Sequence, residues 1–228
     1  MTLLNPTPRT GLRKGLRTAL APLALTTLLV ACTDSAEITQ TTPAPNTATP
    51  PATEETLLLQ APPAWLRIEE QTSDAFRLAE YVPAGQDKDD WNDRLFIEAN
   101  ALKPLPDPIT FLEGMGEALK KECTGSNHSN VHSGFENGYP TSVRLLICNK
   151  SNVNARSEVS IIKAIQGEDF FYVISRARRS DALQNDTPPL TNKEMGEWSL
   201  YMRSVKVCDP RTDKHPCPVT SRGATSGR

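Results

Sequence analysis

Five cysteines are the residues of this chain with the most distinctive chemistry. A cysteine thiolate can act as a nucleophile, bind zinc or enter a disulfide. The segment around each cysteine decides which of these reactions applies. Cys32 stands alone near the amino terminus, and the other four lie in the second half of the chain: Cys123, Cys148, Cys208 and Cys217.

Cys32 closes an apolar segment that has the organisation of a signal peptide. Residues 1–17 carry four basic side chains and no acidic one, and the largely apolar run 18–31 follows. A charged start before a short apolar core is typical of export signals. The run has 14 residues, fewer than the roughly 20 that a membrane-spanning helix needs. We therefore expect residues 1–31 to be a cleaved signal peptide.

The residues at the end of this run, Leu29-Val30-Ala31-Cys32, resemble the lipobox of bacterial lipoproteins. The resemblance implies that the Cys32 thiol accepts a diacylglyceryl group, that a lipoprotein signal peptidase cuts before Cys32, and that the new amino group receives an acyl chain such as palmitate. Two or three acyl chains hold a protein at a membrane far better than one. Because Thr33 rather than Asp follows the cysteine, the resemblance favours the outer over the inner membrane. A general signal peptide with an incidental cysteine, or an uncleaved helix, is the alternative.

The mature chain expected from this cleavage is mildly acidic. Removing residues 1–31 takes away four of the 25 Lys and Arg and none of the 27 Asp and Glu, which leaves a formal charge of −6. Surfaces that bind nucleic acid are basic. We therefore expect no nucleic-acid partner.

The four remaining cysteines are an even number in an exported chain, which favours disulfides. Three pairings are possible. We favour Cys123 with Cys148 and Cys208 with Cys217, because each pair closes a local segment. Closing loops of about 25 and 9 residues contributes on the order of 3.5 and 2.5 kcal/mol. Four reduced, buried thiols are the alternative.

His128 and His132 follow Cys123 in a polar segment, and these three side chains are possible zinc ligands. A fourth ligand is not evident, and a disulfide competes for the cysteine. We therefore expect solvated histidines and no metal. The sequence contains no Gly-x-Ser-x-Gly, phosphate-loop or His-Glu-x-x-His motif. We expect no catalytic residues and no cofactor.

Composition divides the rest of the chain into a tether, one domain and a tail. Residues 33–55 are mostly Thr, Pro and Ala, so they cannot bury enough apolar surface to fold. We expect residues 32–62 to be a lipidated, disordered tether, residues 63–218 a globular domain and residues 219–228 a disordered tail. The leucines at 57–59 are either a docking segment or the true start of the domain.

The domain contains six strand-like and two helix-like segments. Strands are predicted at 65–69, 75–82, 95–99, 142–148, 158–165 and 169–177. Helices are predicted at 108–122, after the N-cap Asp107, and at 192–205, after a capping box of Thr191 and Glu194. Residues 124–141 are expected to form a loop. We therefore predict an α+β fold with a single antiparallel sheet of about six strands and two packed helices.

Two details of the hairpin predicted at 158–177 concern single residues. Gly167, in the short connection, is expected to supply a positive φ. Arg176, Arg178 and Arg179 end the second arm, and we interpret them as a solvated strand end. Contact with anionic lipid or an acidic partner is the alternative.

The order of three strands, a helix, three strands and a helix resembles the PsbP-type arrangement of small binding proteins. Residues 80–86 with Asp90-Trp91 are similar to a segment of uncharacterised proteobacterial envelope proteins. Neither resemblance implies a catalytic activity. We predict a non-catalytic envelope lipoprotein, anchored through Cys32, whose domain faces the periplasm or the cell surface and binds an envelope protein. A hydrolytic or metal-dependent envelope enzyme and a structural spacer are the alternatives.

Overall fold

The computed structural model describes residues 53–183 and 189–218. The predicted lipidation residue Cys32, the signal peptide, the tail 219–228 and residues 33–52 of the predicted tether lie outside them. Within the part that the structure describes, ten strands and two helices form an α+β fold in which the paired strands are antiparallel. Neither of these helices is long and apolar enough to span a membrane.

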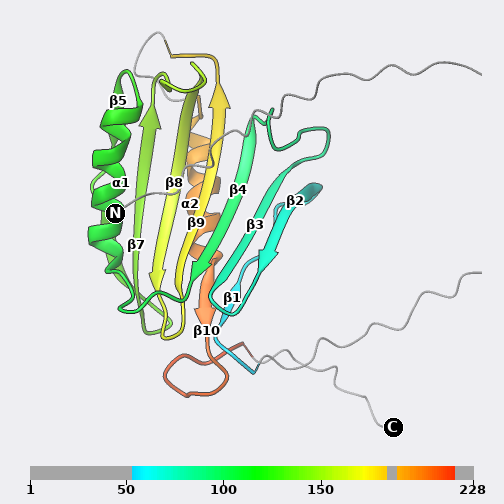
Figure 1. Ribbon diagram of the computed structural model, residues 1–228, viewed down its shortest axis with the longest axis vertical. Coiled ribbons are helices and arrows are strands. Elements are labelled where there is room, and N and C mark those ends of the chain that lie inside the picture. Colours follow the sequence, from blue (N-terminus) through cyan, green and yellow to red (C-terminus); the bar gives the residue numbers. More distant parts are fainter. Residues whose placement is uncertain (1–52, 184–188, 219–228) are drawn as a thin grey trace, which may run out of the picture. The chain divides into compact units, whose positions relative to one another are not determined.

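The main sheet has eight strands, more than the six or so expected from the sequence (Figure 1). In spatial order they are β2 (Trp65–Thr72), β3 (Phe76–Pro83), β4 (Asp93–Asn100), β9 (Phe171–Ser180), β8 (Ser157–Gln166) and β7 (Tyr139–Cys148), followed by β5 (Ser126–His128) and β6 (His132–Glu136). Strands β5 and β6 both pair with β7, each with a different half of it. They form the edge of the sheet opposite β2.

The two additional strands come from residues 124–141, which were expected to form a loop. Strands β6 and β7 form a hairpin around Asn137 and Gly138, whose φ angles are 49° and 82°. Positive φ at both central residues, usually in an Asn-Gly pair, is the signature of a tight hairpin turn. The signal is present in the sequence, but the flanking residues are polar because β6 is largely exposed and β5 partly exposed at the sheet edge.

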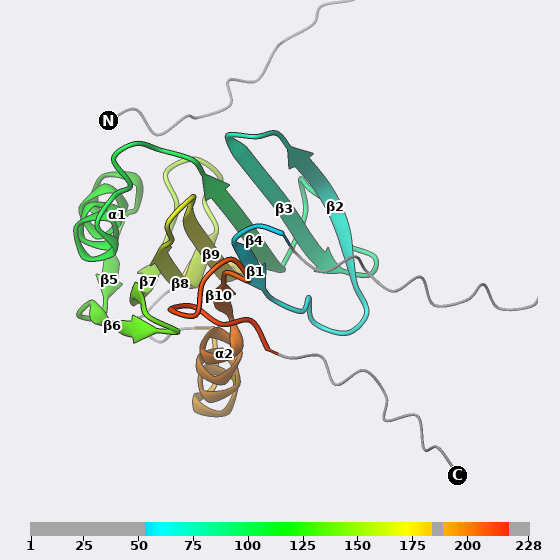
Figure 2. The same ribbon diagram turned by 90° about the horizontal axis from the view of Figure 1, so that it is seen from below.

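Helices cover both faces of the central strands β8 and β9, whose residues are buried on both faces (Figure 2). On one face, α1 (Pro108–Glu122) packs against β7 and β8 through the fully buried Leu112. On the other, α2 (Asn192–Ser204) contributes Trp198 and Met202 to a larger core. The sheet is therefore the middle layer of three.

Both helices begin where the sequence predicted. Asp107 accepts the backbone N–H of Thr110 at 2.8 Å, and this bond lowers the pKa of Asp107. At the start of α2, Thr191 and Glu194 form the predicted capping box. A hydrogen bond from Arg178, together with the bonds from Thr191, lowers the pKa of Glu194 to about 2. The start of α2 is thus fastened to β9.

The domain begins earlier than the expected boundary at residue 63. β1 (Thr56–Leu58) pairs with β10 (Lys206–Cys208) in a separate two-stranded sheet. Leu57 and Leu59 pack against the core on the α2 side of the main sheet. The leucines at 57–59 are therefore part of the domain, because Leu57 and Leu59 bury apolar surface against its core. The composition of the preceding residues is that of a tether and gives no sign of this contact.

The arginines at the end of β9 are not a solvated strand end, contrary to our interpretation of the sequence. The Arg176 guanidinium lies 4.8 Å from the ring centre of Trp198, and that of Arg179 lies 3.7 Å from the ring centre of Trp91. Arg178 binds two carboxylates. All three are partly buried, because aromatic rings from distant segments cover them. The face of an aromatic ring attracts a cation, so these contacts stabilise the partly buried guanidinium groups.

Candidate binding site

The four cysteines of the domain are structural. Cys123 is bonded to Cys148 and Cys208 to Cys217, with sequence separations of 25 and 9 residues, which is the pairing expected from the sequence. The first disulfide joins the end of α1 to the end of β7. The second joins β10 to the C-terminal loop. No thiol of the described residues is therefore left for nucleophilic chemistry or for metal binding.

The two histidines considered as zinc ligands are held apart from any third ligand. His128 Nδ1 lies 2.7 Å from Arg144 Nη2, and Cys123 is oxidised. His132 belongs to the exposed strand β6. Among residues 53–183 and 189–218, no group of three or more His, Cys, Asp or Glu side chains is placed to hold a metal ion.

A cavity of about 470 Å³ lies between α2 and the β6–β7 hairpin, and we call it the α2 groove. Its apolar lining side chains are Val143, Leu145, Ile161, Met195 and Met202. Its remaining lining residues are Ser129, His132, Ser133, Gly134, Phe135, Glu136, Thr141, Arg144, Ser199 and Arg203. The volume lies within the range of natural ligand pockets, about 300–1,000 Å³.

The groove exists because α2 covers only part of its face of the sheet. Trp198 and Met202 pack α2 against apolar residues of β4, β8 and β9. Strand β6 lies to one side of the helix (Figure 2). Val143 and Leu145 of β7 consequently remain partly exposed and form the floor of the groove, where an apolar group can be buried.

The buried Lys163 fixes the position of the groove walls. Its Nζ donates to Glu136 Oε2 at 2.5 Å and to the carbonyl oxygens of Met202 at 2.8 Å and Val205 at 2.7 Å. All three ammonium N–H groups are therefore used, and a cation at the C-terminus of α2 is favourable. Burial lowers the pKa of Lys163, although the bond to Glu136 opposes that shift. Lys163 thus connects β8 to both β6 and α2.

The charged group of the groove that has no partner of opposite charge among the described residues is Arg203, which is exposed. Arg144 lies on the opposite face of β7, where its guanidinium donates to the carbonyl oxygens of Leu112 in α1 and of Ser129 and contacts His128. The single acidic residue of the lining, Glu136, is paired with Lys163. The groove therefore offers an apolar floor and a positive rim.

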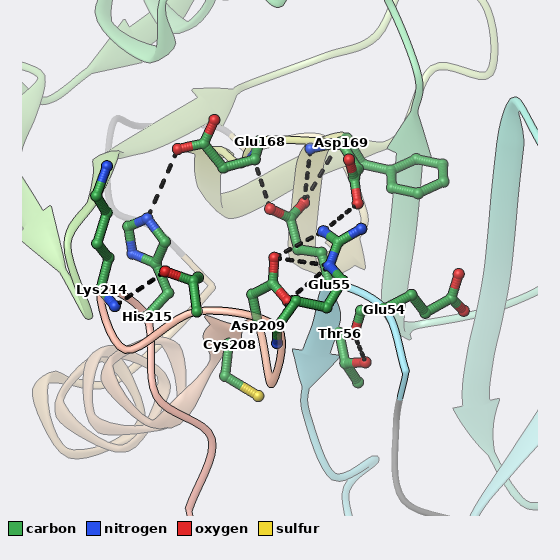
Figure 3. A network of polar contacts seen from close by, with 12 residues as sticks. Glu54, Glu55, Thr56, Glu168, Asp169, Cys208, Asp209, Lys214 and His215 are labelled. Carbon is green, nitrogen blue, oxygen red and sulfur yellow. Dashed lines mark hydrogen bonds and ion pairs between the residues drawn. The ribbon is translucent and has the colours of Figure 1, made fainter.

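A second polar cluster surrounds Glu55 (Figure 3). The Glu55 side chain is fully buried and accepts three successive backbone N–H groups of the β8–β9 turn, from Glu168 at 2.6 Å, Asp169 at 3.3 Å and Phe170 at 3.2 Å. A Cβ on Gly167 would overlap the Glu55 carboxylate. Gly167 is not in the left-handed φ region, so the expected reason for this glycine is wrong: the turn needs space, not a positive φ.

The neighbours of Glu55 are also engaged with one another. Arg211 binds Asp209 and Asp169, each at 2.6 Å, and the bond from Arg211 lowers the pKa of Asp209. The His215 ring stacks on Tyr139 with 3.8 Å between centroids. Burial, and then the nearby charge of Glu55, raise the pKa of Tyr139. Glu55, Asp209, Arg211 and Asp169 are all paired, whereas the buried Tyr139 hydroxyl has no hydrogen-bond partner among the described residues. We interpret the cluster as a structural fastening of the segments around Glu55 and Asp209 to the β8–β9 turn.

Sequence reasoning found the disulfides but not the groove. Of the groove lining, only His132 had been considered as a ligand. Met195 and Met202 recur at helical spacing with Trp198, a pattern that is typical of core residues. Met202 is indeed buried, whereas Met195 is only partly buried and lines the groove. A helical apolar stripe does not reveal how far the sheet extends beyond the helix that covers it.

No family model matches this chain, and no curated protein is significantly similar to it. Among solved structures, it is similar to the Ran-binding protein Mog1p of Saccharomyces cerevisiae, with 13% identity over 70% of this chain and 98% of that chain and a TM-score of 0.39. It is also similar to LpqN of Mycobacterium tuberculosis, which is involved in cell envelope biogenesis, with 16% identity over 71% of this chain and 87% of that chain and a TM-score of 0.42. The resemblances to lipoproteins and to PsbP-type proteins stay predictions.

Proposed function

We propose that this chain is an envelope lipoprotein, anchored by lipid on Cys32, whose domain binds another envelope protein through the α2 groove without catalysing a reaction. The observation that carries the binding role is the groove itself, in which an apolar floor lies beside Arg203, a cation that has no acidic partner in the described residues. Apolar surface with a few placed polar groups is what ligand sites combine. The one carboxylate of the lining is held by Lys163, which suits a structural role better than proton transfer.

The anchor is tested by acyl labelling of cells that produce the wild type or the Cys32→Ala variant. Labelling is expected to vanish in the variant while export through the signal peptide continues. Labelling that persists in the variant contradicts the assignment of Cys32. Mass spectrometry of the mature protein is the second readout, and its amino terminus is expected at residue 32.

The binding role is tested by placing a photo-crosslinking amino acid at Ser199, which lines the groove, in intact cells. The matched control position is Leu200, the next residue of α2, whose side chain is 65% exposed and does not line the groove. A discrete adduct from position 199 and none from position 200 supports the proposal. Absence of any adduct favours a structural spacer. Stoichiometric zinc that is lost on replacing His128 and His132 favours a metal-dependent enzyme.

A further inference from the structure

The two edges of the main sheet differ in how they are protected from pairing with another strand. Strand β2 has a bulge between Arg67 and Glu69, and charged side chains line it. Bulges and charges are the usual protections of an exposed edge. Strand β6 pairs with β7 in a continuous register, and its first four residues, His132 to Phe135, include no Lys, Arg, Asp, Glu or Pro. Strand β2 is therefore protected from pairing with another strand by its bulge and its charges, and residues 132–135 of β6 have neither protection.

The outer edge of β6 is also available. Within residues 53–183 and 189–218, no backbone hydrogen bond connects this edge to another segment. Its residues are mostly exposed, and the Phe135 side chain is 76% exposed. An extended chain can add to such an edge because unpaired backbone N–H and C=O groups alternate along it.

Gly134 connects this edge to the α2 groove. Alternate residues of a strand share a face, and Glu136 reaches Lys163 beneath α2, so His132, Gly134 and Glu136 face the groove. A Cβ on Gly134 would meet no atom within 4 Å. The side chain of a strand added outside β6 can therefore cross above Gly134 and reach the apolar floor.

The charges of the groove select the chemistry of such a strand. Arg203 lies at the rim without a carboxylate partner among the described residues, and the acidic Glu136 is neutralised by Lys163. A carboxylate placed two residues from the inserted apolar side chain projects from the same face and meets this positive rim. A basic segment would meet like charge, which costs affinity.

We propose that the partner docks as an extended protein segment that adds as a strand to β6, inserts a bulky apolar side chain across Gly134 into the α2 groove, and places a carboxylate two residues away against the cationic rim. This inference rests on the proposed binding function and deepens it by naming the partner's chemistry. Backbone bonds to β6 supply affinity, and the groove supplies specificity.

The first test selects nine-residue peptides from a random displayed library on the purified domain. The expected consensus is a bulky apolar residue with Asp or Glu two positions away. The selected peptide is then synthesised in two N-methylated forms, each blocking one alternate set of backbone N–H groups. One form is expected to bind at least about tenfold more weakly and the other nearly unchanged, since only every second N–H faces β6. Equal effects of both forms, or a selection that yields no such consensus, overturn the proposal.

The second test uses paired variants of the domain with the same peptide. Gly134→Val is expected to weaken binding at least about tenfold by closing the path into the groove, whereas Gly196→Val, the same change at an exposed position of α2 that does not line the groove, changes it less than about twofold. Arg203→Glu is expected to weaken binding about tenfold, and Lys193→Glu, the same charge change elsewhere on α2, only slightly. Equal effects within either pair contradict the proposed geometry.

Two further outcomes separate this inference from the proposed function. If the photo-crosslink from Ser199 forms in cells and no extended peptide binds, the binding role stands and strand addition is wrong. If sedimentation shows a dimer that Gly134→Val dissociates, the occupant of the β6 edge is a second copy of this chain, and the proposed partner chemistry is wrong. Amide hydrogen exchange supplies an independent readout, with protection by peptide expected at residues 132–136.

Discussion

The Nζ atom of Lys163 lies 2.5 Å from Glu136 Oε2, and this contact joins a fully buried lysine of a central strand to a partly exposed carboxylate at the sheet edge. The same ammonium group caps the C-terminus of α2 through two carbonyl oxygens. One side chain therefore sets the distance between the two walls of the α2 groove.

Lys163→Met is expected to destabilise the domain by about 3 kcal/mol, because it leaves Glu136 and two helix carbonyls without their donor. The free energy of unfolding from urea titration measures this loss. Lys206→Met, at an exposed lysine of β10, is the control and is expected to change stability by less than about 0.5 kcal/mol. A Lys163→Met protein as stable as this control would show that the contact does not hold the walls.

The contact between Glu55 and Gly167 predicts a non-additive pair of substitutions. Glu55→Ala is expected to cost about 3 kcal/mol, because three buried N–H groups lose their acceptor. Gly167→Ala is expected to cost about 2 kcal/mol by overpacking against the Glu55 carboxylate. In the double variant the added methyl group meets no carboxylate, so the combined loss should fall below the sum of the two.

Gly114→Ala is the control for the glycine substitution. Gly114 lies in α1 with open space around its Cβ position, so alanine is expected to stabilise the domain by up to about 1 kcal/mol through helix propensity. Denaturant unfolding of all four variants checks the prediction. Additive losses for Glu55 and Gly167 would mean that the two residues are not in contact.

Gly167 also illustrates what the sequence conceals. A turn at 166–168 was predicted from local composition and the structure has it at 167–170, but the need for glycine comes from Glu55, which lies more than a hundred residues earlier. The helix caps at Asp107 and Thr191 and the two short-range disulfides were predicted because their partners lie nearby in the chain. Contacts between distant residues leave no comparable local signal.

The edge strands show the same limit for the candidate site. Residues 126–136 are polar because β5 and β6 lie at the edge of the sheet, so the composition of the segment 124–141 suggests a loop. The Asn137-Gly138 pair was the available signal for the β6–β7 hairpin. The groove depends on how far β6 extends beyond α2, and this offset is a property of packing rather than of any single segment.

Acid is expected to weaken the attachment of α2 through Glu194. The folded-state pKa of Glu194 is about 2, below the ordinary 4.5, chiefly because Arg178 donates to its carboxylate. A carboxylate with a depressed folded pKa contributes stability that is present above pH 4.5 and is lost as the pH falls toward about 2. The contribution comes from the bonds to Arg178 and Thr191.

The measurement is the midpoint of thermal unfolding against pH for the wild type and Glu194→Gln. Glutamine preserves a capping box but not the charge, so the two midpoints are expected to differ at neutral pH and to converge as the pH approaches about 2. Other carboxylates contribute equally to both proteins and cancel in the difference. Glu197→Gln changes an exposed position of the same helix, where the carboxylate lies 3.9 Å from Lys193. It should follow the wild type throughout. A constant difference between wild type and Glu194→Gln at all pH values would contradict the assignment.

Removing the disulfides one at a time is expected to rank them by loop length. Replacing Cys123 and Cys148 together with Ser should cost about 3.5 kcal/mol, and replacing Cys208 and Cys217 about 2.5 kcal/mol, because the longer loop restricts the unfolded chain more. Residues 209–217 also bind the rest of the domain through Arg211 and His215, so these contacts should keep the C-terminal loop in place without its disulfide. Urea titration under non-reducing conditions measures both losses, and hydrogen exchange of residues 209–217 reports whether the loop stays docked. Losses below about 1 kcal/mol for both pairs would show that the thiols are not bonded in the native protein.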